Sequence, residues 1–260
     1  MTSPALQARG LRKAYGALVV TDDVDLSLAG GCRHALIGPN GAGKTTLVGI
    51  LCGAIRPDAG RIALDGADVT REGPHRRVKR GLVRTFQVSS LFPNFSVVDN
   101  LYLAISEHAG ATTNLFRPAG RQSLLLERVD ALIERMGLQD DAYRQVSTIA
   151  YGKQRLLELA IALALEPKVL LLDEPAAGIP SAEAGLVLDA IHSLPADIAI
   201  LMIEHDMQMV RRFAAEVSVL VNGRMLMTGK PEDVMSSDEV RAVYLGRAGN
   251  QRFAGDARAG

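Results

Sequence analysis

The sequence predicts an α/β protein, and three observations carry this prediction. Short apolar runs at 35–37, 169–172 and 198–203 each end in glycine or in polar residues, which is typical of buried strands. Helix-like segments separate these runs along the chain, as in folds built around a parallel sheet. The 260 residues are 48% hydrophobic, so we expect one large domain, or one domain with an inserted subdomain.

The N-terminal segment has a different pattern. Between residues 23 and 28, valine and leucine alternate with aspartate and serine, which is typical of a half-buried strand in an antiparallel sheet. Other strand-like runs lie within 6–28, and residues 61–64, followed by Asp65-Gly66, indicate a further strand and a tight turn. We therefore expect an antiparallel β subdomain in addition to the α/β core.

A phosphate-binding loop follows the first apolar run. Residues 38–46 fit the pattern G-x-x-x-x-G-K-[ST] and lie between that run and a helix-like segment at 47–52. Glycine lets the backbone curl so that successive N–H groups point at an anion, and it stands at Gly38, Gly41 and Gly43. Lys44 is placed to reach the β- and γ-phosphates of a nucleotide, and the Thr45 hydroxyl is placed to ligate Mg²⁺. The sequence therefore predicts a P-loop NTPase (RecA-like) core.

A basic segment and a short strand come next. Residues 71–80 are rich in arginine, lysine and histidine, and we interpret them as a solvated basic helix. Contact with membrane headgroups or with an acidic partner loop is the alternative. Residues 82–86 indicate a strand that delivers Gln87 to its end, and strand ends are where α/β sheets place ligand contacts.

From Val88 to about Gln154, strands give way to helices and loops. Residues 96–105 indicate a capped helix, and apolar residues recur at helical spacing between 125 and 136. Residues 107–123 are rich in glycine, threonine, asparagine and proline, which favours a long loop. A mostly helical subdomain is therefore predicted to interrupt the α/β core.

The α/β pattern resumes with a predicted helix at 153–165. The apolar run that follows ends in Asp173 and Glu174, and the next one ends in Glu204, His205 and Asp206. An acid at the end of a buried strand can hold Mg²⁺, directly or through water, and a neighbouring carboxylate can orient and deprotonate an attacking water. Asp173 fits the first role and Glu174 the second. Because a kinase would also need a pocket for an acceptor substrate, the pair favours an ATPase.

The last part of the chain predicts a hairpin and two short helices. Residues 217–228 form the hairpin, with Asn222-Gly223 as its turn, and the helices start at Pro231 and Asp238. Residues 247–260 are expected to form a frayed tail. These elements complete the predicted fold.

Composition excludes several classes of protein. Lys+Arg and Asp+Glu number 29 each, so no global field favours nucleic acid or an anionic membrane. The longest apolar runs are too short for a bilayer or are interrupted by charges, and no signal peptide is visible, so we expect a cytoplasmic protein without a transmembrane segment. Cys32 and Cys52 are expected to be buried apolar residues rather than a disulfide or a metal pair.

Together these features resemble the nucleotide-binding subunits of ABC transporters, and the likeness covers about residues 6–246. Five motifs stand in that family's order: 38–46 is similar to the Walker A loop, Gln87 to the Q-loop glutamine, 149–154 to the signature segment, 169–174 to Walker B, and His205 to the switch histidine. The resemblance implies a single ABC ATPase domain over 1–246. Within it, the core spans 1–87 and 155–246 and the helical subdomain about 88–154, and the tail follows at 247–260.

The resemblance also implies roles for residues of this sequence. The residues expected to bind ATP are Tyr15, Gly38, Asn40, Gly41, Gly43, Lys44, Thr45, Thr46, Ala150, Tyr151, Gly152 and Gln154. The expected magnesium ligands are Thr45, Gln87 and Asp173, and the expected catalytic residues are Glu174, His205 and Gln87. Tyr15 lies in a turn, where its ring can face adenine or pack on its own hairpin. The family's adenine-stacking aromatic favours the first reading.

By the same resemblance, the ATPase works as a head-to-tail pair that drives membrane-spanning partners. Each ATP is held between the Walker A loop of one protomer and the signature segment of the other. ATP closes the pair, hydrolysis releases it, and the movement passes to two permease subunits and indirectly to a solute-binding protein. The protein is therefore expected on the inner face of the cell membrane, attached through its permeases.

Within the family, four local features are similar to the larger ATPase of importers for branched-chain or other hydrophobic amino acids. They are the signature Ala150-Tyr151-Gly152, the segment 175–180, the long loop before residue 125 and the ending at 243–246. Related systems carry urea, short amides or aromatic acids. An ABC exporter for lipid or lipopolysaccharide, a soluble ABC ATPase acting on nucleic acid or ribosomes, and a P-loop kinase are the alternatives.

Three positions depart from the family's pattern. Ala150 replaces the signature serine, so one hydrogen bond to the γ-phosphate in the partner's site is missing. We therefore expect a heterodimer, in which a second ABC ATPase supplies a serine to the ATP of this chain. Pro180 stands where the family has aspartate or asparagine, which affects signalling across the dimer, and Ile161 replaces a common arginine without an assigned consequence.

Overall fold

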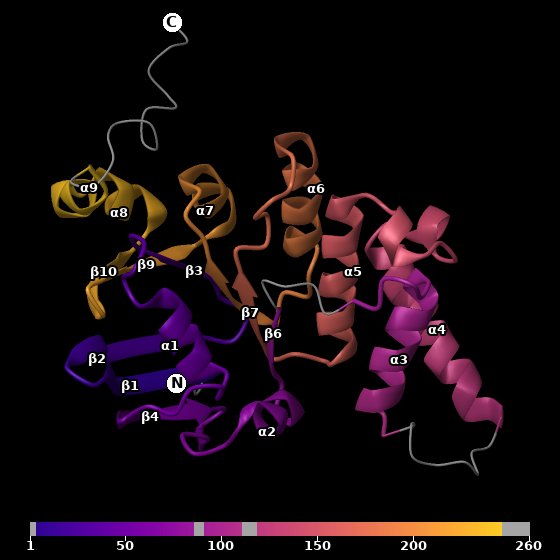
Figure 1. Ribbon diagram of the computed structural model, residues 1–260, viewed down its shortest axis with the longest axis horizontal. Coiled ribbons are helices and arrows are strands. Elements are labelled where there is room, and N and C mark those ends of the chain that lie inside the picture. The colour runs from indigo at the N-terminus through magenta and orange to yellow at the C-terminus, as the bar shows by residue number, and fades with distance from the viewer. Residues whose placement is uncertain (1–3, 86–90, 111–118, 246–260) are drawn as a thin grey trace, which may run out of the picture. The chain divides into compact units, whose positions relative to one another are not determined.

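The computed structural model describes residues 4–85, 91–110 and 119–245. Contacts between residues divide the chain into two compact units. The first, here called the core unit, contains 1–84, 168–174 and 195–260. The second, here called the helical unit, contains 85–167 and 175–194. Figure 1 labels the elements of both.

One sheet of the core unit is antiparallel, with strand order β2-β1-β4-β5. Its strands are β1 (Leu6–Tyr15), β2 (Leu18–Leu28), β4 (Ala59–Leu64) and β5 (Ala67–Asp68). Asp65 and Gly66, with φ of 46° and 79°, form the tight turn between the last two strands. The predicted antiparallel β subdomain is therefore confirmed.

The second sheet has six strands in the order β10-β9-β3-β8-β7-β6. Neighbours run parallel from β9 to β6, and β10 pairs with β9 as an antiparallel hairpin. The strands are β3 (Arg33–Ile37), β6 (Leu82–Arg84), β7 (Val169–Asp173), β8 (Ala199–Ile203), β9 (Glu216–Val221) and β10 (Arg224–Gly229). The predicted α/β class is confirmed, although β6 ends at Arg84 and Phe86 lies outside the described residues.

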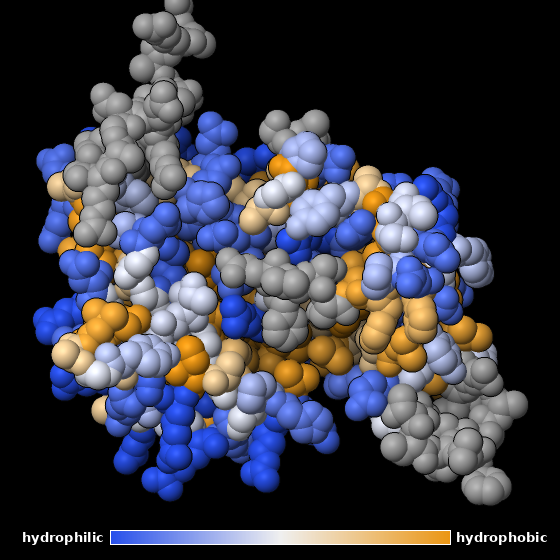
Figure 2. Space-filling model, viewed as in Figure 1, coloured by the Kyte–Doolittle hydropathy of each residue, from blue (hydrophilic) through white to orange (hydrophobic). Residues whose placement is uncertain are grey.

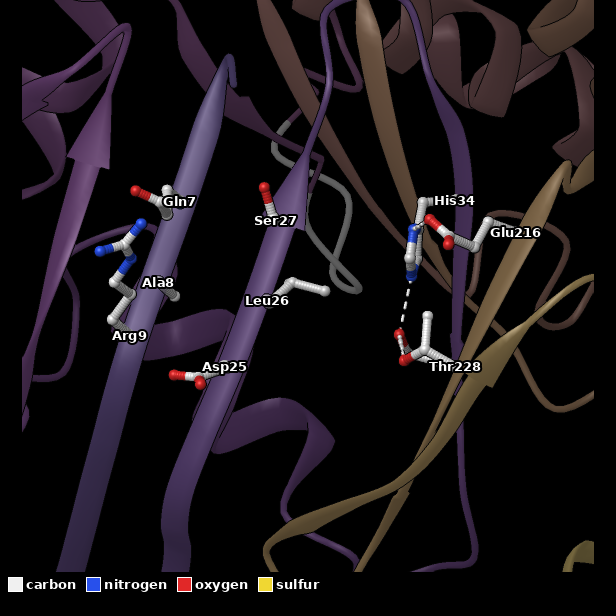
Figure 3. Close-up of a pocket in the computed structure, with 10 residues that line it drawn as sticks. Gln7, Ala8, Arg9, Asp25, Leu26, Ser27, His34, Glu216 and Thr228 are labelled. Atoms are coloured by element: carbon white, nitrogen blue, oxygen red, sulfur yellow. Dashed lines mark hydrogen bonds and ion pairs between the residues drawn. The ribbon is translucent and has the colours of Figure 1, made fainter. Parts of the chain in front are cut away.

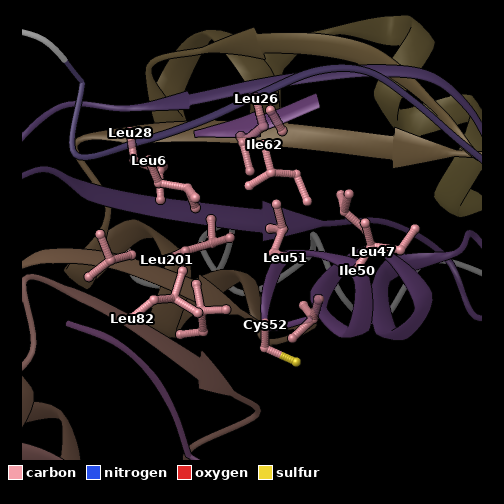
Figure 4. Close-up of a cluster of buried hydrophobic side chains, with 14 of the residues drawn as sticks. Leu6, Leu26, Leu28, Leu47, Ile50, Leu51, Cys52, Ile62, Leu82 and Leu201 are labelled. Atoms are coloured by element: carbon pink, nitrogen blue, oxygen red, sulfur yellow. The ribbon is translucent and has the colours of Figure 1, made fainter. Parts of the chain in front are cut away.

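The parallel sheet of the core unit is buried on both faces. On one face, Leu36 and Leu220 join a cluster with helix α1 (Lys44–Leu51) and the antiparallel sheet, which Figure 4 shows. On the other face, Ala35, Ile37 and their neighbours on β9 pack against further helices. Those helices are α7 (Met207–Phe213), α8 (Pro231–Ser236) and α9 (Asp238–Leu245). Burial on both faces explains why these strands are continuous apolar runs.

Cys32 and Cys52 are free thiols, and Cys52 is buried whereas Cys32 is half-buried. The expectation of buried cysteines without a disulfide is confirmed for Cys52, whereas Cys32 is free but only partly buried. Burial raises the pKa of the Cys32 thiol, with a further contribution from the charge of Glu216. The Cys32 thiol is therefore a poor nucleophile at neutral pH.

The basic segment forms helix α2 (Pro74–Lys79), but the prediction of a solvated basic face is wrong for Arg77. That side chain is fully buried, with 1% of its surface exposed. Its Nη1 donates to the carbonyls of Ile50 (2.7 Å) and Leu51 (2.5 Å), and its Nη2 to those of Val69 (2.8 Å) and Thr70 (3.2 Å). The last carbonyls of a helix have no partner within that helix, so Arg77 stabilises the C-terminal end of α1.

The helical unit contains four α-helices among its described residues. They are α3 (Val97–His108), α4 (Ala119–Arg135), α5 (Tyr151–Ala164) and α6 (Ser181–His192). Ser96 and Asp99 form a capping box at the start of α3, as the sequence predicts. The predicted loop at 107–123 was too long, because α3 continues to His108 and α4 begins at Ala119. The predicted helix at 153–165 starts two residues earlier, so Tyr151 and Gly152 stand in its first turn.

Candidate nucleotide-binding site

The phosphate-binding loop joins the end of β3 to the start of α1 in the core unit. A Cβ atom on Gly38 would lie 2.2 Å from the carbonyl oxygen of Leu220, and one on Gly43 would lie 2.5 Å from that of Val20. Gly43 is also the N-cap of α1, with a φ of 102°, and has no side chain to cap the helix. The N–H groups of the first turn therefore remain available to an anion.

Lys44, Thr45 and Thr46 stand in the first turn of α1, and Asn40 and Thr45 are exposed. The Lys44 ammonium donates to the carbonyls of Gly38 (2.7 Å) and Pro39 (3.1 Å). Burial lowers the pKa of Lys44, and the negative charges of Glu174 and Asp173 oppose this effect. The phosphate loop and the two acids thus act on one another electrostatically.

The two acids stand at the end of β7. Asp173 is the last residue of that strand, and its side chain is only 3% exposed. Its Oδ2 accepts a hydrogen bond of 2.5 Å from Nη2 of Arg84, the last residue of β6. Glu174 has a positive φ of 48°, and its N–H donates to the carbonyl of Ile203, at the end of β8 (2.9 Å). The ends of three neighbouring parallel strands therefore supply the acids and their partners.

His205 follows β8 and lies between two carboxylates. Its Nδ1 is 3.6 Å from Oε1 of Glu174 and 3.8 Å from Oε2 of Glu204. Glu204 is buried, and its Oε2 accepts the N–H groups of His205 (3.0 Å) and Asp206 (3.3 Å). Burial raises the pKa of the Glu204 carboxyl, although those backbone bonds oppose it. The structure therefore brings the predicted base, the switch histidine and a second carboxylate together.

Arg84 and Glu204 were not predicted as site residues from the sequence. Glu204 stands directly before His205 at the end of an apolar run, so its position was a usable signal. Arg84 gave no such signal, because its partner Asp173 is 89 residues further along the chain. Gln87 lies outside the residues that the structure describes.

The chemistry of Thr45 and Asp173 bears on their expected role as magnesium ligands. Within the described ranges, no group of three or more histidine, cysteine, aspartate or glutamate residues can hold a metal ion. Mg²⁺ is commonly held by one or two protein oxygens, with phosphates and waters as its other ligands. A threonine hydroxyl and one buried carboxylate beside a phosphate loop fit this pattern.

Tyr15 ends β1, and 51% of its surface is exposed. The Lys13 ammonium lies 5.4 Å from the centre of its ring and bonds to Asp58 at 2.7 Å. The next strand, β2, carries Val20, whose carbonyl approaches Gly43 of the phosphate loop. The exposed ring is therefore presented from a hairpin that contacts the phosphate loop.

The signature segment lies in the helical unit. Ala150 is the N-cap of α5, and the N–H of Gly152 donates to Oε2 of Glu183 (3.0 Å). Gln154 turns back on its own segment, since its Nε2 donates to the carbonyls of Val146 and Ile149 at 3.2 Å each. The Tyr151 hydroxyl accepts a hydrogen bond of 2.6 Å from Nη2 of Arg155. The side chains of Tyr151 and Gln154 are thus engaged within their own helix and the turn before it.

A cavity of about 370 Å³ elsewhere in the core unit is not part of this site. It lies between β1, β2 and the β9–β10 hairpin, and no residue of the phosphate loop lines it. Figure 3 shows buried His34 and the carboxylate of Glu216 pointing toward one another there. Nδ1 of His34 lies 3.1 Å from Oε2 of Glu216, and Nε2 lies 2.9 Å from Oγ of Ser218, which bonds to Thr228.

Comparisons with known proteins agree with this geometry. The family model described as "ABC transporter" matches residues 21–177. The high-affinity branched-chain amino acid transport ATP-binding protein LivG of Escherichia coli (strain K12) is 39% identical over an alignment of 259 positions, which covers 95% of this chain and 100% of that protein. BraF of Pseudomonas aeruginosa, a protein of the same description, is 36% identical over an alignment of 255 positions, which again covers 95% of this chain and 100% of that protein.

A solved structure has the same fold. The crystal structure of the ADP conformation of MJ1267, an ATP-binding cassette of an ABC transporter, superposes with a TM-score of 0.81 at 27% identity. The match covers 94% of this chain and 100% of that one. Across the part of our structure that can be described, no helix is both long enough and apolar enough to cross a membrane.

Proposed function

Because the chain belongs to the ABC transporter family, in which it is an ATP-binding ATPase, we propose that it powers an importer of branched-chain or other hydrophobic amino acids, or of related small solutes. LivG and BraF, which match this chain over nearly its whole length, are branched-chain amino acid transport ATP-binding proteins. One observation supports ATP hydrolysis by this chain. The phosphate loop, Asp173, Glu174 and His205 meet at the ends of neighbouring strands of one sheet.

We assign the site residues the following roles. The phosphates of ATP lie against the N–H groups of residues 38–46, with Lys44 supplying positive charge, and Tyr15 stacks on adenine. Thr45, Asp173 and Gln87 would hold Mg²⁺, which would neutralise the charge that develops on the phosphates. Glu174 and His205 act on the water molecule that attacks the γ-phosphate.

Glu174 accepts the proton of the attacking water. Its carboxylate follows the buried strand end at Asp173 and is 28% exposed, so a water molecule can reach it. His205 lies 3.6 Å from the same carboxylate, where it can hold the water or the leaving phosphate. Glu204 fixes the backbone of this segment through its bonds to the N–H groups of His205 and Asp206. The carboxylate and the imidazole are therefore positioned before the substrate arrives.

The partner ATPase completes each site in this proposal. Ala150, Tyr151, Gly152 and Gln154 face the ATP that is bound by the Walker A loop of the partner. Ala150 has no hydroxyl to donate to that nucleotide, so the second subunit is a different ATPase with a serine in its signature. A heterodimer places that serine on the ATP of this chain, where Glu174 performs hydrolysis.

The helical unit carries the surface proposed for the permease subunits. Hydrophobic side chains gather over α3 and α4 on the face that Figure 2 shows. The exposed large apolar residues of this unit include Phe92, Phe95, Leu103, Leu124 and Leu126, and the rings of the two phenylalanines stack at 5.4 Å. Such a patch suits a protein partner. The subunit then lies on the inner face of the membrane below two permeases, which connect it to a solute-binding protein.

We further propose that residues 1–246 form a single ABC ATPase domain. Its core spans 1–87 and 155–246, its helical subdomain spans about 88–154, and a tail follows at 247–260. The family match at 21–177 includes strands β4 and β5 of the antiparallel sheet and helices α3 to α5 of the helical unit, which supports one functional domain.

Isolation of the complex tests this function. The chain is tagged in its native host, the membranes are solubilised gently, and the copurifying proteins are identified. We expect two different membrane subunits and a second ATPase with a serine in its signature. Recovery of the chain by itself, or with one kind of membrane subunit, would contradict the heterodimeric importer. The binding protein of the system is then screened with amino acids.

A further inference from the structure

Among the described residues, Arg84 makes one strong ionic contact, and that contact is with the proposed magnesium ligand. Its Nη2 lies 2.5 Å from Oδ2 of Asp173, and the two side chains are 17% and 3% exposed. The pair links adjacent strands, because Arg84 stands opposite Leu171 in the register of β6 and β7. The carboxylate of Asp173, which is expected to bind Mg²⁺, is thus already paired with the guanidinium of Arg84.

The rest of the Arg84 guanidinium is poorly satisfied. Its Nε is buried and has no hydrogen-bond partner within the part of the chain that the structure describes. Within the same described part of the chain, its Nη1 has only a weak contact of 4.0 Å with the sulfur of Cys52, at the end of α1. A permanent structural arginine normally uses most of its five N–H donors, as Arg77 does in the same unit. Asp173 is therefore the main hydrogen-bond acceptor for the Arg84 guanidinium among the described residues.

We propose that Arg84 and Mg²⁺ compete for the carboxylate of Asp173. The inference rests on the proposed role of Asp173 at the nucleotide site. One carboxylate with a single negative charge cannot balance a guanidinium and a dication at hydrogen-bond distance, because the two cations repel one another at this buried position. Arg84 is thus the counter-ion of Asp173 when magnesium is absent, and Mg²⁺ with its nucleotide must displace it.

This competition has a direct consequence for metal binding. Without Arg84, the buried carboxylate of Asp173 lacks its close counter-ion, which destabilises the fold. A dication can then occupy the position without first displacing an arginine. Removal of Arg84 should therefore increase the response of the protein to Mg²⁺, whereas loss of an ordinary structural pair would leave that response unchanged.

Thermal unfolding of the nucleotide-free protein tests the proposal in millimolar MgCl₂ and in EDTA. We expect wild type and Arg84→Lys to melt at nearly the same temperature in both, and Arg84→Met to melt roughly 3 °C or more higher with magnesium. Arg84→Met combined with Asp173→Asn should lose this response. Equal melting of Arg84→Met in the two buffers, or a response that survives in the double variant, would overturn the proposal.

Arg80→Met is the matched control. Arg80 also pairs with a carboxylate in the core unit, since its Nε and Nη2 each lie 2.7 Å from an oxygen of Glu72, but this pair is at the surface. Its melting temperature should not depend on magnesium. A magnesium response of the same size in Arg80→Met would show that the effect is not specific to Asp173.

A second measurement covers the case in which Arg84→Met does not fold. A crystal structure of the wild type with Mg²⁺ and a non-hydrolysable ATP analogue should show the Arg84–Asp173 contact broken. A contact that persists while Mg²⁺ is bound at Asp173 contradicts the competition but leaves the proposed function intact. Failure of the wild type to bind the nucleotide at all would instead contradict the proposed function.

Discussion

Glu174 adopts a backbone conformation that side chains with a Cβ rarely take. Its φ is +48°, and the conformation is held by the hydrogen bond from its N–H to the carbonyl of Ile203. Such strain persists only where the surrounding structure enforces it, and it is concentrated at functional sites. Here it turns the chain directly after Asp173, so that consecutive acids have different surroundings, one nearly buried and one partly exposed.

Replacement of Glu174 by glutamine tests its role as the base. The amide retains the size of the side chain but cannot take a proton from water, so hydrolysis should be at least about 100-fold slower. ATP binding, measured with a fluorescent nucleotide, should be retained. Glu72→Gln removes a surface carboxylate of the core unit and should leave turnover unchanged. Normal hydrolysis by Glu174→Gln would mean that another group is the base.

His34 makes stability depend on pH. Burial lowers its pKa from the ordinary value of 6.5, although the charge of Glu216 opposes the shift. As the pH falls, the unfolded imidazole binds a proton before the folded one does, so unfolding takes up a proton. The contribution of His34 to stability is therefore present above the unfolded pKa of about 6.5 and is lost as the pH falls below it.

The measurement is the free energy of unfolding at about pH 7.5 and about pH 5.5. His34→Gln should lose less stability between these two values than the wild type does. His75→Gln changes an exposed histidine on α2 and should behave as the wild type. An unchanged acid-side loss in His34→Gln would assign the pH dependence to other groups.

At the scale of elements, Arg77 connects three segments of the core unit. Its guanidinium bonds to carbonyls at the end of α1, at Val69 and Thr70, and, through Nε, at Glu72 (3.0 Å). Arg77→Met should lower the free energy of unfolding by about 3 kcal/mol, because buried carbonyls are left without donors. Arg76→Met changes an exposed arginine on the same helix and should alter stability by less than about 0.5 kcal/mol in the same denaturant titration.

These elements also show what the sequence can and cannot predict. The strands that contain Leu36 and Leu171 were predictable, because a strand that is buried on both faces requires an unbroken apolar run. Each of these runs ends where the residues of the candidate site begin. Arg77 was not predictable, since a buried arginine in a basic segment has the same local pattern as its exposed neighbours. The Arg84–Asp173 pair depends on the register of β6 against β7, which a local pattern does not contain. Motifs with fixed spacing identified the candidate site, whereas its long-range ion pair required the fold.

At the scale of the whole molecule, the site residues are distributed over both units. The phosphate loop, Asp173, Glu174 and His205 lie in the core unit, whereas Ala150 to Gln154 lie in the helical unit. In the proposed head-to-tail pair, each nucleotide is shared between the core unit of one subunit and the helical unit of the other. We therefore expect residue 150 to affect the nucleotide of the partner rather than that of its own chain.

Ala150→Ser tests this division between subunits. A serine hydroxyl at the start of α5 can donate to the γ-phosphate of the partner's ATP, a bond to a charged group that contributes about 1.5–3 kcal/mol. In the Glu174→Gln background, which prevents hydrolysis, the variant should form ATP-dependent homodimers at least about tenfold more tightly than Glu174→Gln alone, as measured by sedimentation equilibrium. Addition of Lys44→Ala should abolish this dimer, because the ATP that bridges the subunits is no longer held. If Glu174→Gln alone dimerises as tightly as the serine variant, Ala150 is no obstacle to a homodimer, and the need for a second ATPase must have another physical cause.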